Sequence, residues 1–180
     1  SKLCLLQLAI PGNANENAVI IDTLVDNLDL SPLYEIFENQ NVVKVFHAAR
    51  QDLEIFYLDS GIFPYPLFDT QIAAMVCGFG DQVAYETLVR QLAKQTLDKS
   101  SRFTNWSNRP LTDAQKKYAL ADVTHLRVIY ETLSKQLTEN GRTSWVDEEL
   151  KNIRSPETYN LDPKNSWRRL KTKSNSRRFL

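Results

Sequence analysis

The chain has 180 residues, which is enough for one domain with a sizeable core and a short appendage. Hydrophobic residues make up 42% of it, and no apolar run reaches the roughly 18–20 residues of a membrane-spanning helix. Because no secretory signal opens the chain, we expect a cytoplasmic protein without membrane contact. Two cysteines, Cys4 and Cys77, and two histidines exclude a disulfide framework or a zinc cluster.

Charge is distributed unevenly along the chain, although the net charge is zero. Seven of the 22 basic residues follow Asp162, where no acid occurs, so residues 1–163 carry a net charge of −7. An acidic body with a basic tail is typical of proteins that hold metal-binding or catalytic carboxylates in one part and contact a polyanion with another. A merely solvated tail would give the same pattern.

Three strand-like runs come first, at residues 3–10, 18–24 and 41–48. The turn-forming segment "PGNANEN" joins the first two, which predicts an antiparallel hairpin. A short helix capped by Ser31, with Pro32 in its first turn, is expected before the third strand. This order predicts an α/β fold in which helices flank a mixed sheet.

Further helical patterns follow the third strand. We expect one helix closed by Gly61, one capped by Asp69 or Thr70, one over residues 84–97, and a long one over residues 112–137. Prolines interrupt the pattern near residues 151–160, so we expect a domain over residues 1–150 and a linker with a further segment over residues 151–180.

An aspartate occupies the apolar face of the last long helix. At about 100° per residue, Asp122 shares a face with Tyr118, Leu126 and Ile129. An unpaired polar group turned toward a core costs about 2–7 kcal/mol, and a charge costs more, so a positive partner is expected. Tyr118 lies one turn earlier and could orient a water molecule, although a tyrosine of the core would have the same spacing.

A second aspartate repeats this pattern, since Asp52 shares a helical face with Ala49, Ile55 and Phe56. A helix cap, a buried salt bridge or a displaced helix boundary would explain one such residue. Two of them on different helices favour a hard divalent cation such as Mg²⁺ or Mn²⁺, which prefers oxygen ligands.

The polar loop before residue 112 combines cations with an aromatic residue. Lys99, Arg102 and Arg109 could pair with phosphates, and Trp106 could stack on a base. A solvated loop held by one buried tryptophan is the alternative.

Long stretches of the chain resemble a known family. "VVKVFHAARQDLEIF" and "YALADV" are similar to the second and third motifs of the ribonuclease D branch of the DEDD 3′-5′ exonucleases, tyrosine subtype. "PLFDTQIAAMVCGFG" and the segment from "LDKSSRFTNW" to "YALADV" match that branch in order and spacing. The resemblance covers nearly the whole chain.

This resemblance implies a ribonuclease H-like fold and two-metal hydrolysis of the 3′-terminal phosphodiester of RNA, such as a tRNA precursor, with release of nucleoside 5′-monophosphates. Asp52 and Asp122 would hold Mg²⁺ or Mn²⁺, and Tyr118 would position the nucleophile. Lys99, Arg102, Trp106 and Arg109 would contact RNA. Residues 151–180 would begin a helical accessory domain of the HRDC type that binds RNA, and no obligate protein partner is implied.

The family's first motif, Asp-x-Glu on an opening strand, is expected just upstream of Ser1, and that strand would lie between the hairpin and residues 41–48. The chain as given is therefore expected to be a fragment with little or no activity. Two alternatives stay open: a non-catalytic RNA-binding module of the same fold, and a 3′-5′ exonuclease directed to DNA.

Overall fold

The computed structural model describes residues 3–11, 17–98 and 100–159. The basic tail and Lys99 lie outside these ranges. The elements in chain order are β1 (Leu6–Ala9), β2 (Ala18–Ile21), α1 (Ser31–Glu38), β3 (Lys44–Phe46), α2 (Arg50–Ser60), β4 (Leu67–Asp69), α3 (Thr70–Val76), α4 (Tyr85–Leu88), the π-helix η2 (Val89–Ala93), α5 (Asp113–Thr124), α6 (Leu126–Glu139), α7 (Thr143–Ile153) and α8 (Pro156–Tyr159).

The described strands form two separate pairs. β1 and β2 are antiparallel, with Leu6 opposite Ile21, which confirms the predicted hairpin. β3 and β4 are parallel, with Phe46 opposite Asp69. No described strand pairs with both β1 and β3. Strands of both directions flanked by helices confirm the predicted α/β class.

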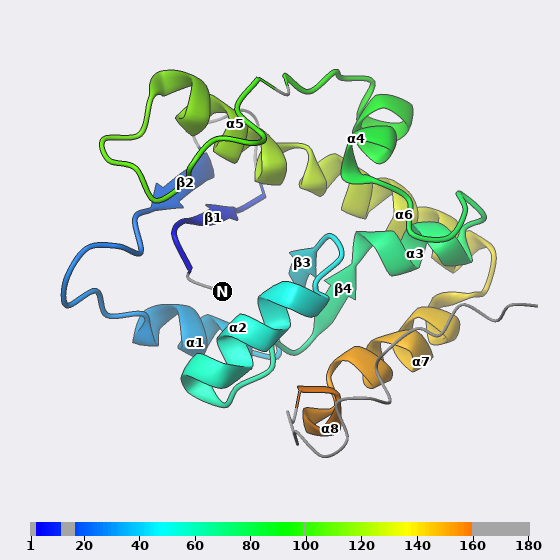
Figure 1. Ribbon diagram of the computed structural model, residues 1–180. Helices are drawn as coiled ribbons and strands as arrows, with labels where there is room; N and C mark the ends of the chain where they lie inside the picture. Colours follow the sequence, from blue (N-terminus) through cyan, green and yellow to red (C-terminus); the bar gives the residue numbers. More distant parts are fainter. Residues whose placement is uncertain (1–2, 12–16, 99, 160–180) are drawn as a thin grey trace, which may run out of the picture.

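Helices hold the two strand pairs in one body (Figure 1). α5 packs on both strands of the hairpin, whereas α6 contacts β3 and α3, and α7 contacts β4 and α3. Among the described residues, no helix is both long and apolar enough to cross a membrane.

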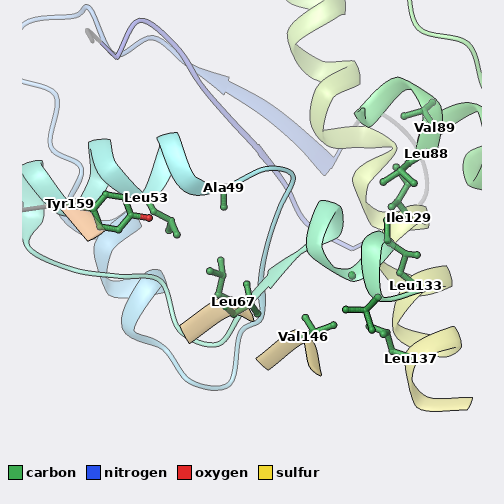
Figure 2. Packing of buried hydrophobic residues seen from close by; sticks show 14 residues of the cluster. Ala49, Leu53, Leu67, Leu88, Val89, Ile129, Leu133, Leu137, Val146 and Tyr159 are labelled. Carbon is green, nitrogen blue, oxygen red and sulfur yellow. The ribbon is translucent and has the colours of Figure 1, made fainter. Parts of the chain in front are cut away.

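The larger core cluster is centred on α6, which contributes three fully buried side chains at intervals of four residues, Ile129, Leu133 and Leu137 (Figure 2). Leu88 and Val89 pack in the same cluster. Burying a side chain of this size stabilises the fold by about 1.5–3 kcal/mol. The cluster therefore fixes α4 and η2 beside α6.

A smaller cluster ties the hairpin to the helices on its other side. Leu6 of β1 packs with Leu33 and Phe37 of α1 and with Phe56 of α2. The rings of Phe37 and Phe56 meet edge to face with centroids 4.9 Å apart. This cluster sets the position of α2 relative to β1.

The prediction of one continuous helix over residues 112–137 is wrong. α5 ends at Thr124, and α6 begins at Leu126. Two carbonyl groups at the end of α5 accept hydrogen bonds from side chains. The Thr124 hydroxyl donates to the Leu120 carbonyl at 2.7 Å, and the Tyr85 hydroxyl donates to the Ala121 carbonyl at 3.0 Å. Side-chain hydrogen bonds inserted in this way bend or interrupt helices.

Several local predictions are confirmed. Gly61 closes α2 in the left-handed conformation at φ 72°, and Asp69 is the N-cap of α3. The Thr112 and Gln115 side chains form a capping box at the start of α5.

Two other predictions about helices are wrong. Leu30, not Ser31, is the N-cap of α1, because the helical hydrogen bonds begin at the Leu30 carbonyl, which accepts from the N–H groups of Leu33 and Tyr34. The helix expected over residues 84–97 is a one-turn α4 followed by the π-helix η2. The consecutive residues Leu88 and Val89 in this segment are both fully buried, which a regular α-helix with one narrow apolar face does not favour.

The predicted domain boundary after residue 150 falls inside α7, and Tyr159 of α8 is still buried in the larger cluster. The segment predicted as a separate unit therefore begins, in the described range, with residues that pack on the main body. Residues 160–180 lie outside that range.

Candidate active site

Tyr118 and Asp122 lie one turn apart on α5 and line one recess of about 420 Å³. Arg102 and Trp106, from the loop that precedes α5, line the same recess. The rings of Trp106 and Tyr118 are in contact, with centroids 5.9 Å apart. Four of the residues predicted for the site are thus brought together.

The Asp122 carboxylate is half-buried and lacks a compensating partner. Loss of solvent raises its pKa to about 6, and the positive charge of Arg102 opposes this only in part. No described residue donates a hydrogen bond to this carboxylate. Burial and the charge of Asp122 also raise the pKa of Tyr118, so its hydroxyl stays protonated and can donate at neutral pH.

Asp52 lines a second, larger recess of about 890 Å³ between α2 and the segment after β2. Leu3 and Ile55 line both recesses, so the two are neighbours. The interpretation of Asp52 as turned into a closed apolar face is corrected here, because its side chain is open to solvent at the recess wall. Its surroundings still reduce its hydration, and this effect and the charge of Asp69 raise its pKa to about 6.

One buried carboxylate fixes the start of the helix that carries Asp52. Asp69, at the end of β4, accepts hydrogen bonds from the backbone N–H groups of Ala48 at 3.1 Å and Ala49 at 2.8 Å, immediately before α2. It also accepts from Gln71 at 2.8 Å in the first turn of α3. Ala48 has a φ of 56°, which non-glycine residues rarely adopt, and the two adjacent hydrogen bonds hold it there.

Arg109, predicted as a substrate contact, makes hydrogen bonds within the protein. Its guanidinium donates to both oxygens of Asp22 on the hairpin, each at 2.6 Å, and to the carbonyl groups of Cys4, Trp106 and Asn108 at 2.8 Å. All five of its N–H groups are therefore engaged. The hydrogen bonds from Arg109 lower the pKa of Asp22 to about 2. The structure assigns Arg109 to fastening the loop to the hairpin.

The same loop is also tied to α5. Gln115 of the capping box donates to the Thr104 hydroxyl at 3.1 Å, and that hydroxyl donates to the carbonyl of buried Ser101 at 2.9 Å. Arg102 follows directly, and its guanidinium lies 5.3 Å from the centroid of the exposed Phe103 ring. The two ties hold Arg102 and Trp106 at the recess that contains Asp122.

The carboxylate oxygen atoms at the site are of the kind that binds divalent cations, but the site has too few carboxylates to hold such an ion alone. Among the described residues, no group of three or more Asp, Glu, His or Cys side chains is placed to hold a metal ion. Asp52 and Asp122 supply hard oxygen donors, and both have raised pKa values that a nearby cation would lower. These two residues could each contribute a ligand.

Three residues close to the site were missed in the sequence. Asp69 was expected to cap one helix and serves two, whereas Tyr85 and His47 drew no attention. Their partners lie 20 to 36 residues away, so no local spacing reveals them.

A family model described as 3′-5′ exonuclease matches residues 1–138. The chain belongs to this 3′-5′ exonuclease family.

Within the family, the expected resemblance to ribonuclease D is confirmed. The chain is 64% identical over 180 residues to a ribonuclease D of Jannaschia sp. and 53% identical over 179 residues to that of Granulibacter bethesdensis. It spans 47% and 44% of the length of these relatives, which is less than half of each.

Solved structures agree with this assignment. The structure of Escherichia coli RNase D, described as an exoribonuclease involved in structured RNA processing, matches with a TM-score of 0.78 and 34% identity over 86% of this chain and 41% of that one. Brucella melitensis NrnC with bound Mg²⁺ shares the fold, with a TM-score of 0.76 and 24% identity over 97% of this chain and 83% of that one.

Proposed function

We propose that the protein carrying this chain removes nucleotides from RNA 3′ ends by hydrolysis and releases nucleoside 5′-monophosphates. The observation that carries this proposal is the placement of Tyr118 and Asp122 in one recess, with Asp52 on the wall of the adjoining one. Structured RNA, such as a tRNA precursor, is the proposed substrate, because the similar E. coli enzyme is described as acting in structured RNA processing. A cytoplasmic location belongs to the same proposal.

Asp52 and Asp122 would each provide oxygen ligands to Mg²⁺ or Mn²⁺. Two such ions supply activation of the attacking water and stabilisation of the leaving oxygen in phosphodiester hydrolysis. With pKa values raised to about 6, both carboxyl groups are still mostly ionised at neutral pH and are therefore available to a cation. Water molecules, phosphate oxygens of the substrate and further carboxylates would complete the ligand set.

Tyr118 would hold and orient the attacking water. Its hydroxyl stays protonated at neutral pH, because burial and Asp122 raise its pKa. The hydroxyl can then donate a hydrogen bond to a water lone pair or a phosphate oxygen. Arg102 would pair with a phosphate beside it, and Trp106, whose ring contacts Tyr118, would pack against the terminal nucleotide.

The proposal is tested on the full-length protein with 5′-labelled RNA in Mg²⁺. Asp122→Asn is expected to abolish shortening from the 3′ end. Asp113→Asn is the matched control, since Asp113 lies on the same helix with a fully exposed side chain. Shortening by the Asp122→Asn variant at the wild-type rate would refute the proposed site.

Two further outcomes would replace the proposal with an alternative. Salt-sensitive RNA binding without any hydrolysis would identify a binding module. Preferential shortening of labelled DNA over RNA of the same sequence would identify a DNA-directed exonuclease.

A further inference from the structure

The junction between α5 and α6 lies at His125, three residues after Asp122. In a continuous α-helix, the N–H of His125 would donate to the carbonyl of Ala121, four residues earlier. Here the His125 N–H is directed to the Val123 carbonyl and to the Tyr85 hydroxyl instead. The Ala121 carbonyl accepts the Tyr85 hydroxyl at 3.0 Å. A side chain from a distant segment has therefore taken the place of a helical hydrogen bond.

Tyr85 is itself held firmly in this position. Its ring contacts the His47 ring, with centroids 5.5 Å apart, and Nδ1 of His47 hydrogen-bonds with the Thr70 hydroxyl at 2.9 Å. Thr70 is fully buried and donates to the carbonyl of Phe46 at the end of β3 at 3.0 Å. The tyrosine thus rests on the same strand ends from which α2 and Asp52 follow.

The helix of one turn that carries Tyr85 is anchored by burial rather than by its own length. Leu88 and Val89 follow Tyr85 and are fully buried against α6, beside Ile129 (Figure 2). This anchor and the His47 contact approach the junction from two sides. The Tyr85 hydroxyl therefore has little freedom to leave the Ala121 carbonyl.

The Tyr85 hydroxyl also lies within electrostatic reach of the proposed site. Burial and, to a smaller extent, the charge of Asp122 raise the pKa of Tyr85, and a hydrogen bond from the His125 backbone N–H opposes this rise. Ala121 is the residue before Asp122, so the backbone group that Tyr85 binds belongs to the peptide next to the aspartate.

We propose that Tyr85 is a positioning residue for Asp122: its hydroxyl interrupts the helix after Asp122 and so sets the direction in which that carboxylate enters the recess with Tyr118. This inference rests on the proposed function for its catalytic consequence, although the interruption itself is a property of the fold. Without the hydroxyl, the Ala121 carbonyl is free to accept the His125 N–H, and α5 joins α6.

The test compares Tyr85→Phe with wild type in the full-length protein. Because a displacement of about 1 Å in a catalytic group can cost about 100-fold in rate, we expect kcat on 5′-labelled RNA to fall on the order of 10–100-fold with KM nearly unchanged. Tyr130→Phe is the matched control, since it removes a hydroxyl from α6 beyond the junction, and its kcat is expected to stay at the wild-type value.

A second readout does not depend on activity. Amide hydrogen exchange at His125 is expected to slow in Tyr85→Phe, because the helical hydrogen bond to Ala121 can form. Exchange that is unchanged or faster would overturn the inference, and so would an unchanged kcat in an active protein. If the wild-type protein does not shorten RNA, the proposed function fails, and the exchange measurement alone decides the inference.

Discussion

Removing the Asp69 carboxylate is expected to be among the most damaging single changes in this domain. The side chain is 2% exposed and accepts four backbone hydrogen bonds of 2.8–3.4 Å, from Ala48, Ala49, Gln71 and Ile72. A hydrogen bond to a charged group contributes about 1.5–3 kcal/mol, and a helix cap about 1 kcal/mol. Because the substitution also removes the cost of burying the carboxylate, Asp69→Ala is expected to lower the free energy of unfolding by about 4 kcal/mol.

Urea denaturation of the full-length protein, followed by intrinsic fluorescence, measures this loss. Asp69→Asn keeps one acceptor oxygen and is expected to lose about half as much, roughly 2 kcal/mol. Asp113→Ala removes an exposed carboxylate from the first turn of α5 and is expected to change stability by less than about 0.5 kcal/mol. If Asp69→Ala lowers the free energy of unfolding by less than about 1 kcal/mol, Asp69 does not stabilise the starts of both α2 and α3 as assigned.

Three further predictions concern the site. Because the pKa values of Asp52 and Asp122 are raised to about 6, both carboxyl groups bind protons as the pH falls below 6. Protons then compete with the cation for these groups. The Mg²⁺ concentration for half-maximal activity is therefore expected to rise as the pH is lowered from 7 to 5. A half-maximal concentration that is constant over this range would contradict this. A lysine cannot replace the five directed N–H donors of Arg109. Arg109→Lys is therefore expected to raise KM for RNA and to speed proteolysis of the loop that contains Trp106. Wild-type values for both would contradict the role of Arg109 in fastening this loop to the hairpin. Arg102→Ala is expected to reduce the salt dependence of RNA binding by about one phosphate contact and to raise the pKa of Asp122 further; an unchanged salt slope would remove Arg102 from the interface.

Features of the site that depend on neighbouring residues were visible in the sequence. The one-turn spacing of Tyr118 and Asp122 predicted that both would line the same recess, which the structure bears out. The spacing of Thr112 and Gln115 predicted the capping box that begins α5. Such patterns are readable because a helix fixes the direction of side chains three and four residues apart.

Features that depend on distant residues were not predictable in this way. Nothing between residues 112 and 137 indicates a break at His125, because the group that takes the Ala121 carbonyl belongs to Tyr85, 36 residues earlier. The intramolecular partners of Arg109 were hidden for the same reason. Its carboxylate partner, Asp22, lies 87 residues away on the hairpin, and without that partner an arginine in a polar loop resembles a phosphate contact.

The two aspartates proposed as ligands are each placed by a polar group from outside their own helix. α2 begins where Asp69 binds the N–H groups of Ala48 and Ala49, and α5 ends where Tyr85 binds the carbonyl of Ala121. Each aspartate lies within four residues of its contact, so a small shift in either contact would be passed on to a carboxylate. Both contacts also trace back to the ends of the β3–β4 pair, Asp69 directly and Tyr85 through its ring contact with His47. A disturbance of this parallel strand pair is therefore expected to reach both carboxylates together, whereas Tyr85→Phe should affect only the one on α5.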